Sequence, residues 1–65
     1  MEFKYIISYS YCDGEISNTV GCHTLNQARE VSEAILQWLM DNFNVRAIDF
    51  VEIYGADGEL VERIF

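Results

Sequence analysis

Residues 3–22, FKYIISYSYCDGEISNTVGC, determine how the chain begins to fold. Apolar and polar side chains alternate from Phe3 to Tyr11, as expected of a strand with one buried face. Asp13-Gly14 follows, and this dipeptide favours a two-residue type I′ turn because both central residues need positive φ. With Cys12 opposite Glu15, the apolar face pairs Tyr11 with Ile16, Tyr9 with Asn18, Ile7 with Val20 and Tyr5 with Cys22, and the polar face pairs Ser10 with Ser17 and Ser8 with Thr19. A slip by one residue would mix the two faces, so the stretch predicts a β-hairpin in one register.

A helix is predicted to follow this hairpin. Thr24 and Gln27 have the spacing of a capping box, in which side chains bind free backbone N–H groups at the start of a helix. From Leu25 to Phe43, apolar residues recur at helical spacing. The apolar stripe comprises Leu25, Ala28, Val31, Ile35, Leu36, Trp38, Leu39, Met40 and Phe43, and the opposite face carries Asn26, Glu30, Glu33, Gln37 and Asp41. We therefore expect an amphipathic helix whose stripe covers a sheet.

The last part of the chain predicts a second hairpin. Ile48–Tyr54 and Leu60–Phe65 are rich in β-forming residues, and a Gly- and Asp-containing segment joins them. If Asp57-Gly58 forms the tight turn, Val51 faces Ile64 on one side, while Phe50 with Phe65, Glu52 with Arg63 and Tyr54 with Val61 share the other. The predicted fold is α+β in the order ββαββ, a four-stranded, mainly antiparallel sheet with one helix on one face. Its expected core contains Tyr5, Ile7, Val20, Val31, Ile35, Leu39, Val51 and Ile53.

Size and charge limit the class of protein. A chain of 65 residues holds a single domain, over residues 1–65, and its 51% hydrophobic content favours a folded chain. The 11 acidic and 4 basic residues give a net charge of −7. This balance disfavours direct binding to nucleic acid or anionic membranes and favours a basic protein surface as the partner. The alternative explanation is that the charge only keeps a small domain in solution.

The sequence predicts neither export nor membrane insertion. Glu2 and Lys4 interrupt any apolar start, and no stretch approaches the roughly 20 apolar residues that span a bilayer. We therefore expect a cytoplasmic protein with reduced cysteines.

No cofactor, metal site or catalytic residue is expected. Cys12 and Cys22 would lie at opposite ends of the first hairpin, roughly 20 to 25 Å apart, so they should neither form a disulfide nor share a metal ion with His23. The sequence contains no phosphate-binding loop, nucleophile elbow or metalloprotease motif. One helix on one sheet should also leave little concavity for a substrate pocket. Binding is therefore a better expectation than catalysis.

Two surfaces are candidates for that binding. The first is acidic and consists of Glu30, Glu33 and Asp41 on the helix, Asp13 and Glu15 at the first turn, and Asp57 and Glu59 at the second. Glu30 and Glu33 stand about 5 to 6 Å apart on a helix, and such like charges suit either water or a basic partner. The second is the sheet face without a helix, where Phe50, Tyr54 and Phe65 would form an apolar contact surface or dimer interface.

In size, charge and build, the chain resembles the phage-encoded anti-CRISPR proteins, many of which present carboxylates that imitate nucleic-acid phosphates. The seven acidic residues named above carry this resemblance. It implies an inhibitor whose acidic surface blocks the DNA-binding surface of a CRISPR effector complex in the cytoplasm of the host cell. The many aromatic residues of the strands depart from this likeness and leave open the alternative, a homodimeric structural or adaptor module that binds a protein partner through the open sheet face.

Overall fold

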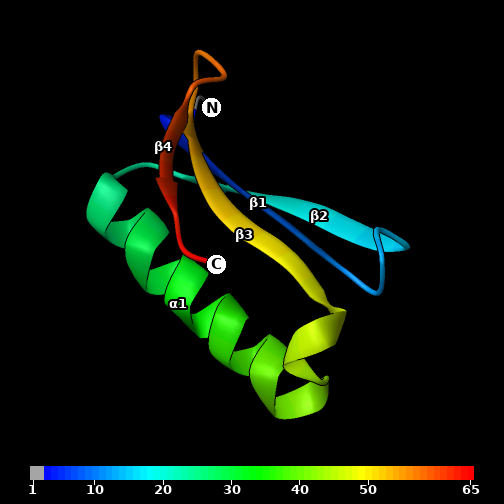
Figure 1. The fold of residues 1–65 in the computed structure, drawn as a ribbon. Coiled ribbons are helices and arrows are strands. Elements are labelled where there is room, and N and C mark those ends of the chain that lie inside the picture. Colours follow the sequence, from blue (N-terminus) through cyan, green and yellow to red (C-terminus); the bar gives the residue numbers. More distant parts are fainter. Residues whose placement is uncertain (1–2) are drawn as a thin grey trace.

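The computed structural model describes residues 3–65, which form one α-helix against one face of a four-stranded antiparallel sheet (Figure 1). The strand order across the sheet is β2-β1-β3-β4, so the central strands come from different hairpins. The elements are β1 (Tyr5–Tyr11), β2 (Ile16–Cys22), α1 (Leu25–Asn42), the 3₁₀ turn η1 (Val45–Ala47), β3 (Ile48–Gly55) and β4 (Leu60–Arg63). The predicted α+β class and the ββαββ order are confirmed.

The first hairpin has the predicted register in all seven pairs, from Tyr5 with Cys22 to Tyr11 with Ile16. Asp13 and Gly14 have φ values of 56° and 82°, as a type I′ turn requires. The next predicted pair is only half formed. The N–H of Glu15 donates to the carbonyl of Cys12 at 3.1 Å, but Cys12 itself has φ 59° and donates its N–H to Ala47 at 2.6 Å. The ladder therefore ends at Tyr11, and the turn is anchored to the segment before β3.

A β-bulge places Asp49 at the same end of the sheet. The pairing of β1 with β3 shifts between Ser10, opposite Phe50, and Tyr11, opposite Ile48, so Asp49 is the extra residue. Bulges redirect side chains. Here the carboxylate Oδ2 of Asp49 accepts hydrogen bonds from Ser10 Oγ at 2.9 Å and from the N–H of Gly14 at 2.7 Å. Asp49 thus ties β3 to the first turn.

The second hairpin differs from the prediction in its turn. The N–H of Gly58 donates to the carbonyl of Gly55 at 2.9 Å, and the N–H of Gly55 donates to the carbonyl of Glu59 at 2.9 Å. The loop between Gly55 and Glu59 therefore has three residues rather than two. Gly58, with φ 89°, occupies the left-handed position that such a loop needs. Tyr54 is consequently opposite Leu60, not Val61. A further shift in the pairing restores the predicted pair of Glu52 with Arg63.

Helix α1 begins as predicted and ends one residue earlier than expected. Thr24 Oγ1 accepts from the N–H of Gln27 at 3.1 Å, while Gln27 Oε1 accepts from the N–H of His23 at 2.8 Å. The return bond therefore reaches the residue before the cap, a variant of the capping box. At the other end, Phe43 is already extended, and its N–H donates to Leu39 at 2.8 Å.

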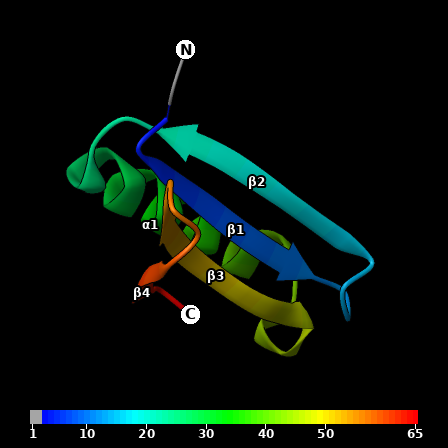
Figure 2. The same ribbon diagram turned by 90° about the horizontal axis from the view of Figure 1, so that it is seen from above.

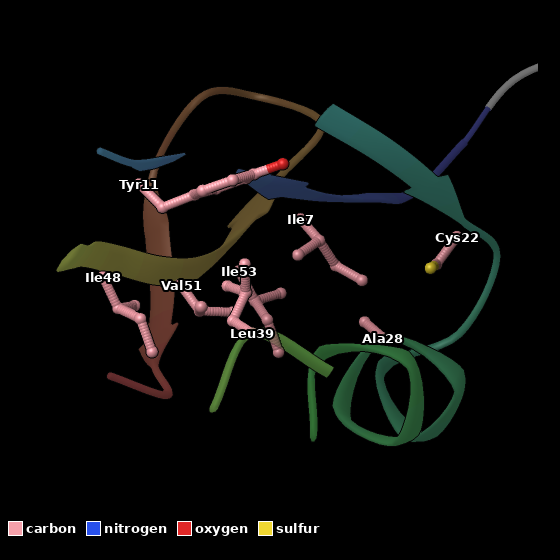
Figure 3. Packing of buried hydrophobic residues seen from close by; sticks show 8 residues of the cluster. All are labelled: Ile7, Tyr11, Cys22, Ala28, Leu39, Ile48, Val51 and Ile53. Atoms are coloured by element: carbon pink, nitrogen blue, oxygen red, sulfur yellow. The ribbon is translucent and has the colours of Figure 1, made fainter. Parts of the chain in front are cut away.

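The core lies between α1 and the central strands (Figure 3). Four predicted core residues, Ile7, Leu39, Val51 and Ile53, are fully buried. Leu39 of α1 lies beside Val51 and Ile53 of β3 (Figure 3). The other four, Tyr5, Val20, Val31 and Ile35, are partly buried and pack against this cluster.

Two predictions for the helical stripe are wrong. Trp38 and Met40 are 51% and 48% exposed, so the true core face of α1 is narrower than the sequence pattern. Ser32 is fully buried on that face, and its Oγ has no hydrogen-bond partner among residues 3–65. It lies one turn after Ala28 and two turns before Leu39, so a small side chain there allows α1 to approach the sheet closely.

Phe3 also differs from its predicted place in the first strand, because β1 begins only at Tyr5. The Phe3 ring lies where a side chain at Gly21 would project, since a Cβ built there would come within 2.3 Å of the ring. Gly21 therefore makes room for Phe3 beside β2.

Candidate protein-binding surfaces

The outer face of α1 carries three of the candidate acidic residues. Glu30, Glu33 and Asp41 are all exposed. Glu30 and Asp41 are about 16 Å apart along the helix axis at the usual rise per residue. Asp41 Oδ1 accepts a hydrogen bond from Gln37 Nε2 at 2.9 Å. The face is thus anionic along more than half of the helix.

The four acidic residues of the turns lie at the two ends of the sheet. Asp13 and Glu15 follow Tyr11 at one end of β1, whereas Asp57 and Glu59 follow Gly55, which pairs with Tyr5 at the other end (Figure 2). All four are exposed. The structure therefore spreads the seven predicted acidic residues over the molecule, and they do not form one cluster.

Two of the four basic residues form ion pairs with acidic residues of the same chain. Arg29 Nε bonds to Glu62 Oε1 at 2.9 Å and links α1 to β4, and Arg63 Nη2 lies 3.0 Å from Glu52 Oε2. None of the seven candidate acidic residues forms an ion pair with another residue of the described chain. Almost all of the net charge of −7 is consequently displayed to solvent.

The sheet face without a helix carries a polar network among its aromatic residues. Glu52 is 8% exposed, and it accepts from Tyr54 Oη at 2.9 Å and from Arg63 Nε at 3.0 Å. The pairing of Glu52 with Arg63 was predicted, whereas the burial of Glu52 and the hydrogen bond from Tyr54 were not. Phe50 and Tyr54 are half-buried, and Phe65 is 37% exposed. The face is thus less apolar than the three aromatic residues alone suggested.

The same hydrogen bond raises the pKa of Tyr54 above its ordinary value. Burial and the negative charge of Glu52 act in the same direction, while the positive charge of Arg63 lowers the pKa. Tyr54 therefore remains a neutral donor to Glu52 at physiological pH.

The structure shows more concavity than expected, including two open recesses on the surface of residues 3–65. One of about 560 Å³ lies between the start of β1 and the second turn and is lined by Phe3, Tyr5, Leu60, Val61 and residues of the turn. The other, of about 410 Å³, is the α1 groove, lined by Tyr9, Val31, Ala34, Ile35 and Trp38. The α1 groove is the more apolar of the two.

The aromatic wall of the α1 groove is held in place by its neighbours. The Trp38 ring makes edge contacts with Tyr11 and Phe43, at centroid distances of 6.4 and 5.9 Å. The sequence interpretation assigned Trp38 to the core and so missed the α1 groove. The signal that could have revealed it is the mismatch between one helix and a sheet of four strands, which leaves an edge strand uncovered.

Cys12 lies beyond one end of the first hairpin, and Cys22, with His23 next to it in the chain, lies at the other end. Both cysteines are free thiols, Cys22 is buried, and His23 is exposed with its ring centroid 5.2 Å from that of Phe3. Burial raises the pKa of the Cys22 thiol. Across residues 3–65, no three His, Cys, Asp or Glu side chains are grouped to hold a metal ion.

Comparison with known proteins adds no relative. In the part of the chain that the structure describes, no helix is long and apolar enough to cross a membrane. The sequence matches no model of a known protein family, and no curated protein and no solved structure matches it.

Proposed function

We propose that this protein is a protein-binding inhibitor and a partial nucleic-acid mimic, whose acidic surface blocks the DNA-binding surface of a CRISPR effector complex. One observation supports the proposal above others: seven exposed carboxylates have no ion-pair partner within residues 3–65, while two of the four basic residues are paired internally. A basic partner would meet an anionic surface that is already free of internal counter-charges. The proposed place of action is the cytoplasm of the host cell.

The spacing of the carboxylates favours imitation of a few phosphates rather than of a whole duplex. Duplex DNA carries one charge per about 1.7 Å of axis, so about nine phosphates would fall within the roughly 16 Å between Glu30 and Asp41. The helix offers three carboxylates over that length. We infer that affinity comes from a small number of Lys and Arg contacts and is completed by other parts of the surface.

Displacement of DNA from purified CRISPR effector complexes tests this proposal. The parent chain should compete with target DNA, and the double variant Glu30→Gln with Glu33→Gln should compete more weakly because it removes two candidate phosphate mimics. The matched control is Asn26→Lys with Gln37→Lys, which shifts the net charge equally on the same helix face and keeps every carboxylate. If both double variants lose competition equally, only the net charge matters; if neither loses it, the acidic face of α1 is not the binding surface.

A homodimeric module is a second candidate function, and the exposed apolar residues near β4 favour it. Leu60, Val61 and Phe65 are all exposed there. The variant Phe65→Ser separates the two candidates, because it should leave DNA competition unchanged if the acidic surface acts. Loss of a dimer in sedimentation together with loss of competition would instead support the homodimeric module.

A further inference from the structure

The α1 groove borders β2, most of which the helix leaves uncovered, because Tyr9 in the groove pairs with Asn18 of β2. Helix α1 begins next to the end of β2 and runs beneath β1 and β3, so that β2 lies beyond its flank (Figure 2). Within β2, only Cys22, beside the start of the helix, is buried. Ile16 and Asn18 pair with Tyr11 and Tyr9 and therefore point to the helix side of the sheet, where both are exposed. Among residues 3–65, no second layer covers this part of the sheet.

The helix side of the α1 groove has the pattern of a helix-packing surface. Val31, Ala34, Ile35 and Trp38 are spaced i, i+3, i+4 and i+7, the stripe with which one helix contacts another. A second helix packs about 8 to 10 Å from the axis of the first. That distance spans about two strand spacings and would place the second helix over the uncovered face of β2. The small side chain of Ala34 lets it approach closely.

Trp38 gives this surface a ready anchor. It is 51% exposed, yet its ring is fixed by edge contacts with Tyr11 and Phe43. A half-exposed aromatic side chain that needs little reordering on binding is typical of the residues that dominate interface energies.

The charges around the α1 groove select the partner. Glu30 and Asp41 lie four residues before and seven residues after Ala34, so both line the solvent side of the helical stripe. Strand β2 has no charged residue, and Arg29 leans to the opposite flank of α1, where it binds Glu62 of β4. A second copy of this chain would bring two acidic rims together, which costs affinity. A helix with Lys or Arg beside its apolar stripe would meet complementary charge.

We propose that the α1 groove binds a basic amphipathic helix of a partner protein. The apolar stripe of that helix contacts Trp38, Val31 and Ile35, and its basic residues lie over Glu30 and Asp41. This inference rests on the proposed function, because it assumes the basic partner proposed there. It adds which structural element of that partner the protein binds.

The only tryptophan of the chain reports directly on this site. The probe is a synthetic peptide of about 18 residues, or about five helical turns, made of Leu at i, i+3, i+4 and i+7 spacing and Lys elsewhere. Bound in the α1 groove, it should shift Trp38 emission to shorter wavelength and protect Trp38 from acrylamide. Ala34→Gln, which fills the α1 groove at an exposed helix position, should weaken binding about tenfold or more, equivalent to ~1.4 kcal/mol. Ala56→Gln, the same change at the exposed second turn, should leave affinity unchanged.

Several results would overturn the inference. The peptide could bind without a change in Trp38 emission, or it could bind the Ala34→Gln variant as tightly as the parent. A peptide with Glu in place of Lys could bind equally well. Finally, the chain could form a dimer that buries Trp38 without peptide. DNA competition separates this inference from the proposed function. The peptide could bind in the α1 groove while the chain displaces DNA from no effector. In that case the inference of a helix-binding groove stands and the proposed function fails. If Ala34→Gln displaces DNA as well as the parent does, the proposed function stands and the α1 groove is not the element that holds the partner.

Discussion

At the residue scale, the carboxylate of Asp49 joins the start of β3 to the end of β1 and to the first turn, which lie far from it in the sequence. It accepts hydrogen bonds from the buried Ser10 hydroxyl and from the N–H of Gly14. Asp49→Ala should lower the free energy of unfolding by about 1 to 3 kcal/mol, because Ser10 would lose its partner while buried. Urea denaturation measures this loss. Asp41→Ala is the control, since its carboxylate bonds only an exposed glutamine, and equal effects of the two changes would contradict the role of Asp49.

Tyr54 provides a pH-dependent test of the network around Glu52. Its pKa is raised, first through the hydrogen bond to Glu52. The folded state therefore holds the proton more tightly than the unfolded chain does. The resulting stabilisation is complete below the ordinary tyrosine pKa of about 10 and is lost as pH rises through the higher folded value. In an absorbance titration of the four tyrosines, Tyr54→Phe should remove a late transition, and Glu52→Gln should move it to lower pH. A late transition that survives Tyr54→Phe belongs to another residue.

The two cysteines should differ in reactivity. Cys12 is half-buried at the first turn, whereas Cys22 is buried and its pKa is raised, which disfavours the reactive thiolate. A thiol reagent should therefore modify Cys12 in the folded protein and Cys22 only as the chain unfolds. Cys22→Ser identifies the slow phase. We also expect a chelator to leave the unfolding midpoint unchanged, and a shift with chelator would require a metal ion bound near His23.

At the element scale, Leu39 and Met40 are neighbours on α1 with opposite surroundings. Leu39 is fully buried against β3, and Met40 is about half exposed. Leu39→Ala should lower the free energy of unfolding by about 2 to 5 kcal/mol, enough to unfold much of so small a domain. Met40→Ala, one residue away, should change it by less than about 0.5 kcal/mol. Equal effects would mean that α1 is rotated relative to the sheet.

The two hairpins explain how much of the fold the sequence could predict. In the first, seven alternating pairs on both sides of Asp13-Gly14 allow one register, and that register is observed. In the second, Asp57-Gly58 suits both a two-residue turn and a three-residue loop with Gly58 in the left-handed position. The strands around it alternate poorly, so no pattern of faces could separate these options. The bulge at Asp49 likewise depends on contacts between β1 and β3, which belong to different hairpins.

The exposed and buried faces of the helix were predicted less accurately than its ends. The exposure of Glu30, Glu33 and Asp41 follows from helical periodicity alone. The exposure of Trp38 does not, because periodicity places an apolar residue on a face without saying whether a strand lies opposite. Only the divergence of α1 from β2 decides this, and it depends on the strand order (Figure 1).

At the scale of the whole molecule, the fold pairs two of its four basic residues internally and leaves most of its carboxylates exposed. Arg29 forms an ion pair between the helix and the sheet, and Arg63 forms one within the sheet. Carboxylates without ion pairs are exposed along α1 and at both turns. The α1 groove adds an apolar surface beside the acidic face. The proposed partner therefore meets both kinds of contact at one side of the helix.

The association rate with a purified CRISPR effector, measured by stopped flow at increasing salt, tests the electrostatic claim most directly. Exposed charges are screened over about 8 Å at about 0.15 M salt, so association guided by the acidic surface slows as salt rises. The Glu30→Lys, Glu33→Lys double variant should associate more slowly at low salt and approach the parent rate at high salt, with its fold intact because both side chains are exposed. Association that is independent of salt and unchanged in this variant, but lost in Phe50→Ser or Tyr54→Ser variants that remain folded, would contradict the account and assign binding to the open sheet face.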